Sequence, residues 1–141
     1  MQTEAEHSAS NIEQTVDKPR VLIVEDDPIT NEVIQFYLKN QYLVDVAVTE
    51  QQALGFIKSK KYFAVLLDIN LGRGGNGLNV LKEIRKIPEL KNLPVIAETA
   101  FALNGDAEEF LGAGCNYYLS KPFIKPELIN VLNKIREGIA K

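Results

Sequence analysis

The amino-acid sequence predicts an α/β fold, a doubly wound (βα)5 parallel sheet of five strands with helices on both faces. Two observations support this prediction. Residues 21–24 and 63–67 are short, continuous apolar runs, as expected of strands covered on both faces. Each run is followed by a segment with apolar residues at helical spacing, and this alternation repeats along the chain. Alternating strands and helices indicate right-handed crossovers, which place the strands parallel in one sheet.

The first half of the chain also predicts the strand order. Asp27 and Pro28 give the first helix an N-cap and a proline at its first position. Over residues 44–48 every second residue is valine, which is typical of a half-exposed strand at a sheet edge. Thr49 or Glu50 then opens the next helix. With this second strand at an edge, the flavodoxin-like order 2-1-3-4-5 fits best.

The second half continues the alternation with weaker signals. After the strand at 63–67, the pattern predicts a helix that stops before Pro88 and a strand at 94–97. It then predicts a helix capped by Asn104, a strand at 116–120 and a last helix from Pro126.

Composition bounds the class of protein. Residues 1–19 are polar and without periodicity, so we expect a disordered tail or linker there and one domain over residues 20–141. The net charge of −3, without a basic cluster, argues against direct binding of nucleic acid. No apolar run is long enough to cross a membrane. The lone Cys115 excludes an intrachain disulfide, and a cytoplasmic location follows as the simplest expectation.

Polar residues stand where the predicted strands end. The first strand ends in Glu25 and Asp26, the third in Asp68, the fourth in Thr99 and the fifth in Lys121. Carboxylates that converge repel each other unless a cation offsets them, and oxygen ligands suit Mg²⁺. A hydroxyl and an ammonium could contact phosphoryl oxygens. Together these groups predict phosphoryl transfer onto a carboxylate.

Four segments carry a family resemblance: "VLIVEDDP", "VLLDINL", "PVIAETA" and "YYLSKPF". In this order and spacing they are similar to the receiver domains of bacterial two-component response regulators. The resemblance covers residues 20–141.

The resemblance implies a role for each matching residue. These roles are the phosphoacceptor Asp68; the Mg²⁺ ligands Asp26 (direct), Glu25 (through water), Asp68 and Asn70 (backbone carbonyl); the phosphoryl contacts Thr99 and Lys121; and the switch residues Thr99 and Tyr118.

The same resemblance implies the partners. A histidine kinase or a histidine phosphotransfer protein would donate the phosphoryl group, and an unidentified protein target would bind a surface within residues 104–141. The domain would catalyse only its own phosphorylation and dephosphorylation, so it is not expected to be a conventional enzyme. Two roles stay open, a signalling switch and a phosphorelay shuttle.

The sequence departs from the family pattern in the loop and at two acidic positions. Gly72 replaces the usual proline, and the loop from Asp68 to Gly77 is one residue longer than is common. Glu25 stands where aspartate is frequent, and Glu98 stands where an apolar residue is typical.

Three other functions are disfavoured. Residues 72–77 match the dinucleotide fingerprint G-x-G-x-x-G, but residues 68–71 separate them from the strand end, and no second nucleotide-binding half exists. A phosphatase of the haloacid dehalogenase type needs a second acid where Asn70 stands. A pseudo-receiver, which binds partners without phosphorylation, is disfavoured by the complete set of acceptor, acid, hydroxyl and lysine.

Overall fold

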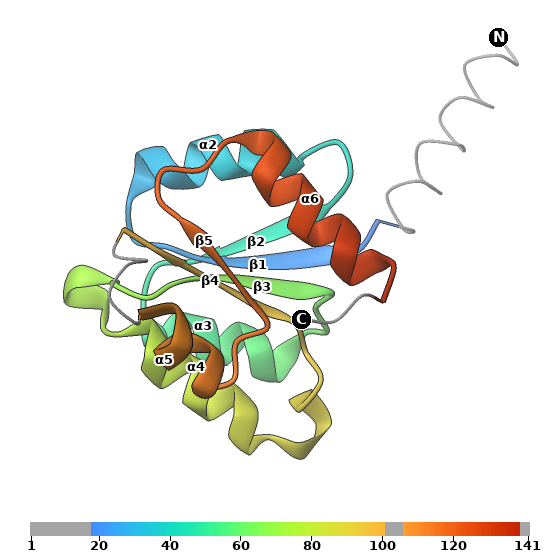
Figure 1. Cartoon of the computed structure of the whole chain (residues 1–141). Coiled ribbons are helices and arrows are strands. Elements are labelled where there is room, and N and C mark those ends of the chain that lie inside the picture. Colours follow the sequence, from blue (N-terminus) through green and yellow to red (C-terminus); the bar gives the residue numbers. More distant parts are fainter. Residues whose placement is uncertain (1–17, 101–105, 139–141) are drawn as a thin grey trace, which may run out of the picture.

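The computed structural model describes residues 18–100 and 106–138. It contains a five-stranded parallel sheet with the order β2-β1-β3-β4-β5, which confirms the predicted topology (Figure 1). The strands are β1 (Arg20–Val24), β2 (Leu43–Ala47), β3 (Ala64–Asp68), β4 (Val95–Thr99) and β5 (Tyr117–Ser120). The α-helices are α2 (Pro28–Leu38), α3 (Glu50–Ser59), α4 (Gly77–Lys86), α5 (Asp106–Gly112) and α6 (Lys125–Arg136). Two short 3₁₀ turns, Gly72–Gly74 and Pro88–Leu90, flank α4.

The helices cover the sheet in two layers. Helices α2 and α6 lie on one face, and α3, α4 and α5 lie on the other (Figure 1). Because side chains alternate along a strand, Ile23 and Leu66 pack with Ile34 of α2, whereas Leu22 and Leu67 belong to the opposite core. Burying one such side chain contributes about 1.5–3 kcal/mol, so the two apolar layers hold the strand ends in place.

The predicted start of α2 is confirmed, and the last helix begins one residue before the predicted Pro126. The Asp27 side chain accepts a hydrogen bond from the backbone N–H of Thr30 at 3.0 Å, and Pro28 is the first residue of α2. The choice between Thr49 and Glu50 is also settled, because Thr49 caps α3 and Glu50 is its first residue. Within residues 18–100 and 106–138, no helix is long and apolar enough to span a membrane. Asn104, the predicted cap of α5, lies outside the described residues.

The glycine-rich loop packs against its neighbours. Gly72 and Gly75 have φ angles of 58° and 116°, which favour glycine. A Cβ atom on Gly77 would collide with the backbone carbonyl of Asp68. The Glu50 carboxylate accepts a hydrogen bond of 2.6 Å from the backbone N–H of Asn76 and so ties the loop to α3. The glycines therefore serve close packing beside the end of β3, not the turn of a dinucleotide site.

Candidate functional site

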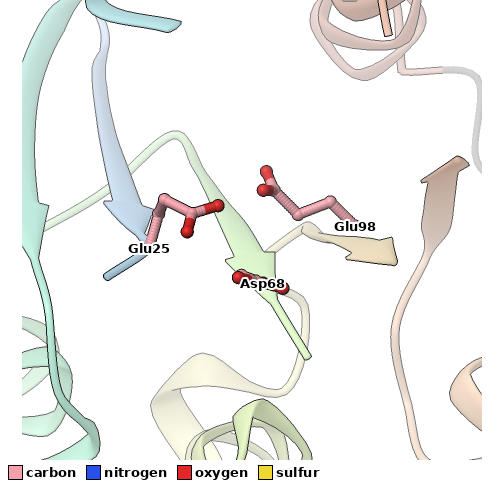
Figure 2. A group of neighbouring side chains, drawn as sticks. All are labelled: Glu25, Asp68 and Glu98. Atoms are coloured by element: carbon pink, nitrogen blue, oxygen red, sulfur yellow. The ribbon is translucent and has the colours of Figure 1, made fainter. Parts of the chain in front are cut away.

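Four strand ends bring three carboxyl groups around one ammonium group. The Nζ atom of Lys121 lies 2.8 Å from Oε1 of Glu25, 3.1 Å from Oδ2 of Asp68 and 3.5 Å from Oε1 of Glu98. Figure 2 shows the carboxyl groups of Glu25 and Glu98 turned toward each other, with Asp68 on the strand between theirs. The three acids are buried. We call these four residues the lysine–carboxyl cluster.

Strand register explains why these residues meet. Asp68 and Glu98 are direct partners in the pairing of β3 with β4. Two residues earlier, Leu66 and Ile96 are also partners, and both belong to the core beneath α2 and α6. Side chains two residues apart on a strand share a face, so Asp68 and Glu98 point to that same side of the sheet. Lys121 extends β5, because its backbone N–H donates to the carbonyl of Thr99 at 2.8 Å.

Burial and the closeness of the other charged groups shift the pKa of each acid in the cluster. Burial, and then the Glu25 carboxylate, raise the pKa of Asp68 from 3.8 to about 6, although Lys121 acts in the opposite direction. Burial, and then the neighbouring carboxylates, raise the pKa of Glu98 well above its ordinary value. Burial also acts to raise the pKa of Glu25, but Glu98 and Lys121 outweigh it and the net shift is downward.

Lys121 keeps its charge in this setting. Burial acts to lower the pKa of Lys121, but the carboxyl groups of Glu25, Glu98 and Asp68 raise it above its ordinary value. One ammonium therefore faces three acids, and the pKa values of two of them, Asp68 and Glu98, are raised. A site with this balance favours an added cation.

A pocket of about 490 Å³ opens beside the cluster. It is lined by all but one of the predicted site residues: Glu25, Asp26, Asp68, Asn70, Thr99 and Lys121. The missing residue, Tyr118, pairs with Ala97 and is 39% exposed, so the structure does not bring it into the pocket.

The exposed Asp26 and the loop residue Asn70 lie on the open side of the pocket. The Asp26 carboxylate reaches the loop, since a Cβ atom on Gly72 would lie 3.0 Å from its Oδ2. The backbone N–H of Asn70 donates to Oδ1 of Asp68 at 3.1 Å. The two oxygens of Asp68 therefore face different neighbours, the loop on one side and Lys121 on the other.

The donor chemistry of the site fits a hard divalent cation. Glu25, Asp68 and Glu98 each offer an oxygen, and these oxygens lie within 4.8 Å of one another. Mg²⁺ prefers oxygen ligands and retains several waters, for which the open pocket has room. Lys121 already lies against all three acids, so the Asp26 side of the pocket is the more accessible place for an ion.

Sequence reasoning missed the part that Glu98 has in the cluster. The pattern marked Glu98 only as a departure from an apolar position. The available signal was its spacing from Ile96, because residues two apart on a strand point to the same face. The sequence alone does not give the register of β3 against β4, and this register is what places Glu98 on the same face of the sheet as Asp68.

We expect Asp68→Asn to raise the free energy of unfolding by about 1–3 kcal/mol at pH 7 in metal-free buffer. The folded protein holds the Asp68 proton more tightly than the unfolded chain, because burial raises the pKa to about 6. Wild-type stability from this group therefore falls as pH rises from about 4 to about 6. Urea unfolding of both proteins at pH 7 and pH 4 tests this prediction. The variant should have the higher free energy of unfolding at pH 7 but not at pH 4. A variant less stable than wild type at pH 7 would contradict it.

Similarity to known proteins identifies the family. The profile of the response regulator receiver domain matches residues 21–133. The polar-differentiation response regulator DivK of Brucella anthropi is 32% identical over 113 residues, which cover 79% of this chain and 91% of DivK. The signal transduction histidine-protein kinase BarA of Shigella flexneri is 31% identical over 119 residues, which cover 84% of this chain but 13% of the kinase.

A solved structure agrees in both fold and sequence. It is the receiver domain of the sensor histidine kinase PA1611 from Pseudomonas aeruginosa, with a magnesium ion coordinated in its active-site cleft. Its TM-score is 0.76 at 36% identity, and the match covers 83% of this chain and 96% of that domain. The chain therefore belongs to the receiver domain family of two-component response regulators, which are signalling domains and not conventional enzymes.

Proposed function

We propose that this domain accepts a phosphoryl group on Asp68 in the presence of Mg²⁺, in the cytoplasm, and that phosphorylation switches a protein-binding surface. The donor is the phosphohistidine of a histidine kinase or of a histidine phosphotransfer protein. The observation that carries the proposal is the position of Asp68. Its carboxylate lines an open pocket and lies 3.1 Å from the Lys121 ammonium, with an elevated pKa of about 6.

The chemical step is a transfer between two nucleophiles. An Asp68 oxygen attacks phosphorus, the P–N bond to the donor imidazole breaks, and the electron pair of that bond stays on the imidazole, which takes up a proton. The product is an acyl phosphate on Asp68. Lys121 and the Thr99 hydroxyl line the same pocket and can contact the equatorial oxygens, where charge gathers in the transition state.

The metal would be held by residues of the same pocket. Asp26 and Asp68 provide carboxylate oxygens, Asn70 its backbone carbonyl, and Glu25 an acceptor for a metal-bound water. When bound, Mg²⁺ supplies positive charge for the phosphoryl oxygens and offsets the repulsion among the acids. The magnesium ion in the cleft of the PA1611 receiver domain supports this assignment.

Output would run through Thr99 and Tyr118 to a surface within residues 104–141. Tyr118 is 39% exposed in this structure, and its ring would turn inward as Thr99 engages the phosphoryl group. The phosphorylated state would gain population through this differential contact. The ends of this range, Asn104 and Lys141, lie outside the described residues.

We expect incubation with acetyl phosphate and Mg²⁺ to add one phosphoryl group to the wild-type protein and none to Asp68→Asn. The amide of asparagine is not a nucleophile toward phosphorus at neutral pH, and the rest of the pocket is unchanged. Intact mass spectrometry measures the adduct. Asp27→Asn is the matched control, because this exposed acid also borders the pocket but serves as the cap of α2. It should be labelled as wild type.

Two outcomes would count against the proposal. If Asp68→Asn were labelled as much as the wild type, another residue would be the phosphoacceptor. Absence of any adduct, both with acetyl phosphate and with a phosphorylated histidine phosphotransfer protein, would favour the pseudo-receiver alternative.

An apolar groove next to the pocket supports docking of the phosphodonor. Ile29, Val33, Tyr37 and Phe123 line it, and it shares Thr30, Ala100 and Lys121 with the phosphoacceptor pocket. Ile29 is 70% exposed, and Phe36 on the same helix is 63% exposed. A donor must bring its phosphohistidine into contact with Asp68, so it must cover surface beside this pocket. The groove offers it apolar area.

We expect Ile29→Ala to slow phosphoryl transfer from a cognate donor protein by about tenfold, which corresponds to the loss of an apolar side chain buried in an interface. Labelling by acetyl phosphate should not change, because Ile29 lines the groove but not the phosphoacceptor pocket. Leu111→Ala is the control, since Leu111 is 45% exposed but lies on α5. If Ile29→Ala and wild type accept phosphate from the protein donor at the same rate, the groove is not the docking surface.

A further inference from the structure

Glu98 is a buried acid without a hydrogen bond. Its side chain has no exposed area, and neither of its carboxyl oxygens has a hydrogen-bond partner among the described residues. Its nearest cation, Lys121, lies 3.5 Å away and is closer to Glu25 and Asp68, at 2.8 and 3.1 Å. Buried polar groups are usually paired, because an unpaired one costs free energy. Glu98 is therefore held only by one long ion pair to Lys121 and by the nearby Glu25 carboxyl group, and this weak pairing calls for a role in another state of the site.

The charges of the cluster indicate what that state is. Glu25 and Asp68 are the two main acceptors of the Lys121 ammonium, and they are also proposed to serve the metal. Without a third acceptor, Lys121 and the metal would compete for the same two carboxylates. Glu98 is the acid of the cluster that the proposed metal site does not use.

We propose that Glu98 is a positioning residue that receives the Lys121 ammonium when Glu25 and Asp68 turn to the metal. This inference rests on the Mg²⁺ site of the proposed function. The movement it needs is small, because the Lys121–Glu98 distance of 3.5 Å must shorten only to that now seen to Glu25, 2.8 Å. The flexible lysine stem permits it. Glu98 thereby keeps Lys121 ordered beside Asp68 and frees two carboxylates for the cation.

The test is the Mg²⁺ affinity of the full chain, measured by calorimetric titration for wild type, Glu98→Gln and Glu98→Leu. The glutamine carbonyl can still accept from Lys121, so Glu98→Gln should bind Mg²⁺ within about threefold of wild type. Leucine offers no acceptor. Glu98→Leu should bind about tenfold more weakly, the typical effect of losing one charge-assisted hydrogen bond.

Two controls separate this role from general effects of charge and folding. Glu109→Gln removes an exposed acid that also lines the pocket, and it should change the affinity less than about twofold. In a Lys121→Met background, Glu98→Leu should no longer weaken Mg²⁺ binding, because Glu98 acts through Lys121. Thermal unfolding of each variant verifies that it is folded at the titration temperature.

The outcomes are distinct. Equal affinity of Glu98→Leu and wild type overturns the inference and leaves the proposed metal site intact. Equal weakening by Glu98→Gln and Glu98→Leu assigns Glu98 as a direct metal ligand and overturns the positioning role. A wild-type protein that binds no Mg²⁺ overturns both the inference and the proposed metal site.

Discussion

The interaction on which the site depends is the contact of one ammonium with three carboxyl groups. Lys121 lies within 3.5 Å of Glu25, Asp68 and Glu98. Burial, together with acid neighbours that a single positive charge cannot balance, raises the pKa values of Asp68 and Glu98. The cluster is therefore short of positive charge before any ligand arrives. This shortage accounts for the affinity for a cation that the proposed function requires.

The fold creates this crowding and also sustains it. Parallel strands end at the same edge of a sheet, and the order β2-β1-β3-β4-β5 places the ends of β1, β3 and β4 next to each other. These features were predictable from the sequence, because apolar runs, helix caps and the alternating edge strand are local patterns. The closeness of Glu25 and Asp68 followed from them, since β1 and β3 are neighbours in this strand order.

Other features depend on contacts that local patterns do not encode. The part played by Glu98 required the register of β3 against β4, which sets the face to which each side chain points. Residues 72–77 match a nucleotide-binding fingerprint in the sequence, but Gly77 is there because the Asp68 carbonyl leaves no space for a side chain. Asp26 was grouped with the other acids, yet it lies at the exposed rim beside Gly72 and is not among the ion-pair partners of Lys121. Each of these facts is a property of packing between distant segments.

The central claim is that a divalent cation completes an under-compensated acidic site, and stability measured against Mg²⁺ concentration tests it most directly. A ligand that binds only the folded state raises the free energy of unfolding with the logarithm of its concentration above the Kd. We expect this rise for the wild-type protein, with EDTA as reference, and its loss in Asp26→Asn. A free energy of unfolding that is the same in Mg²⁺ and in EDTA would contradict the account.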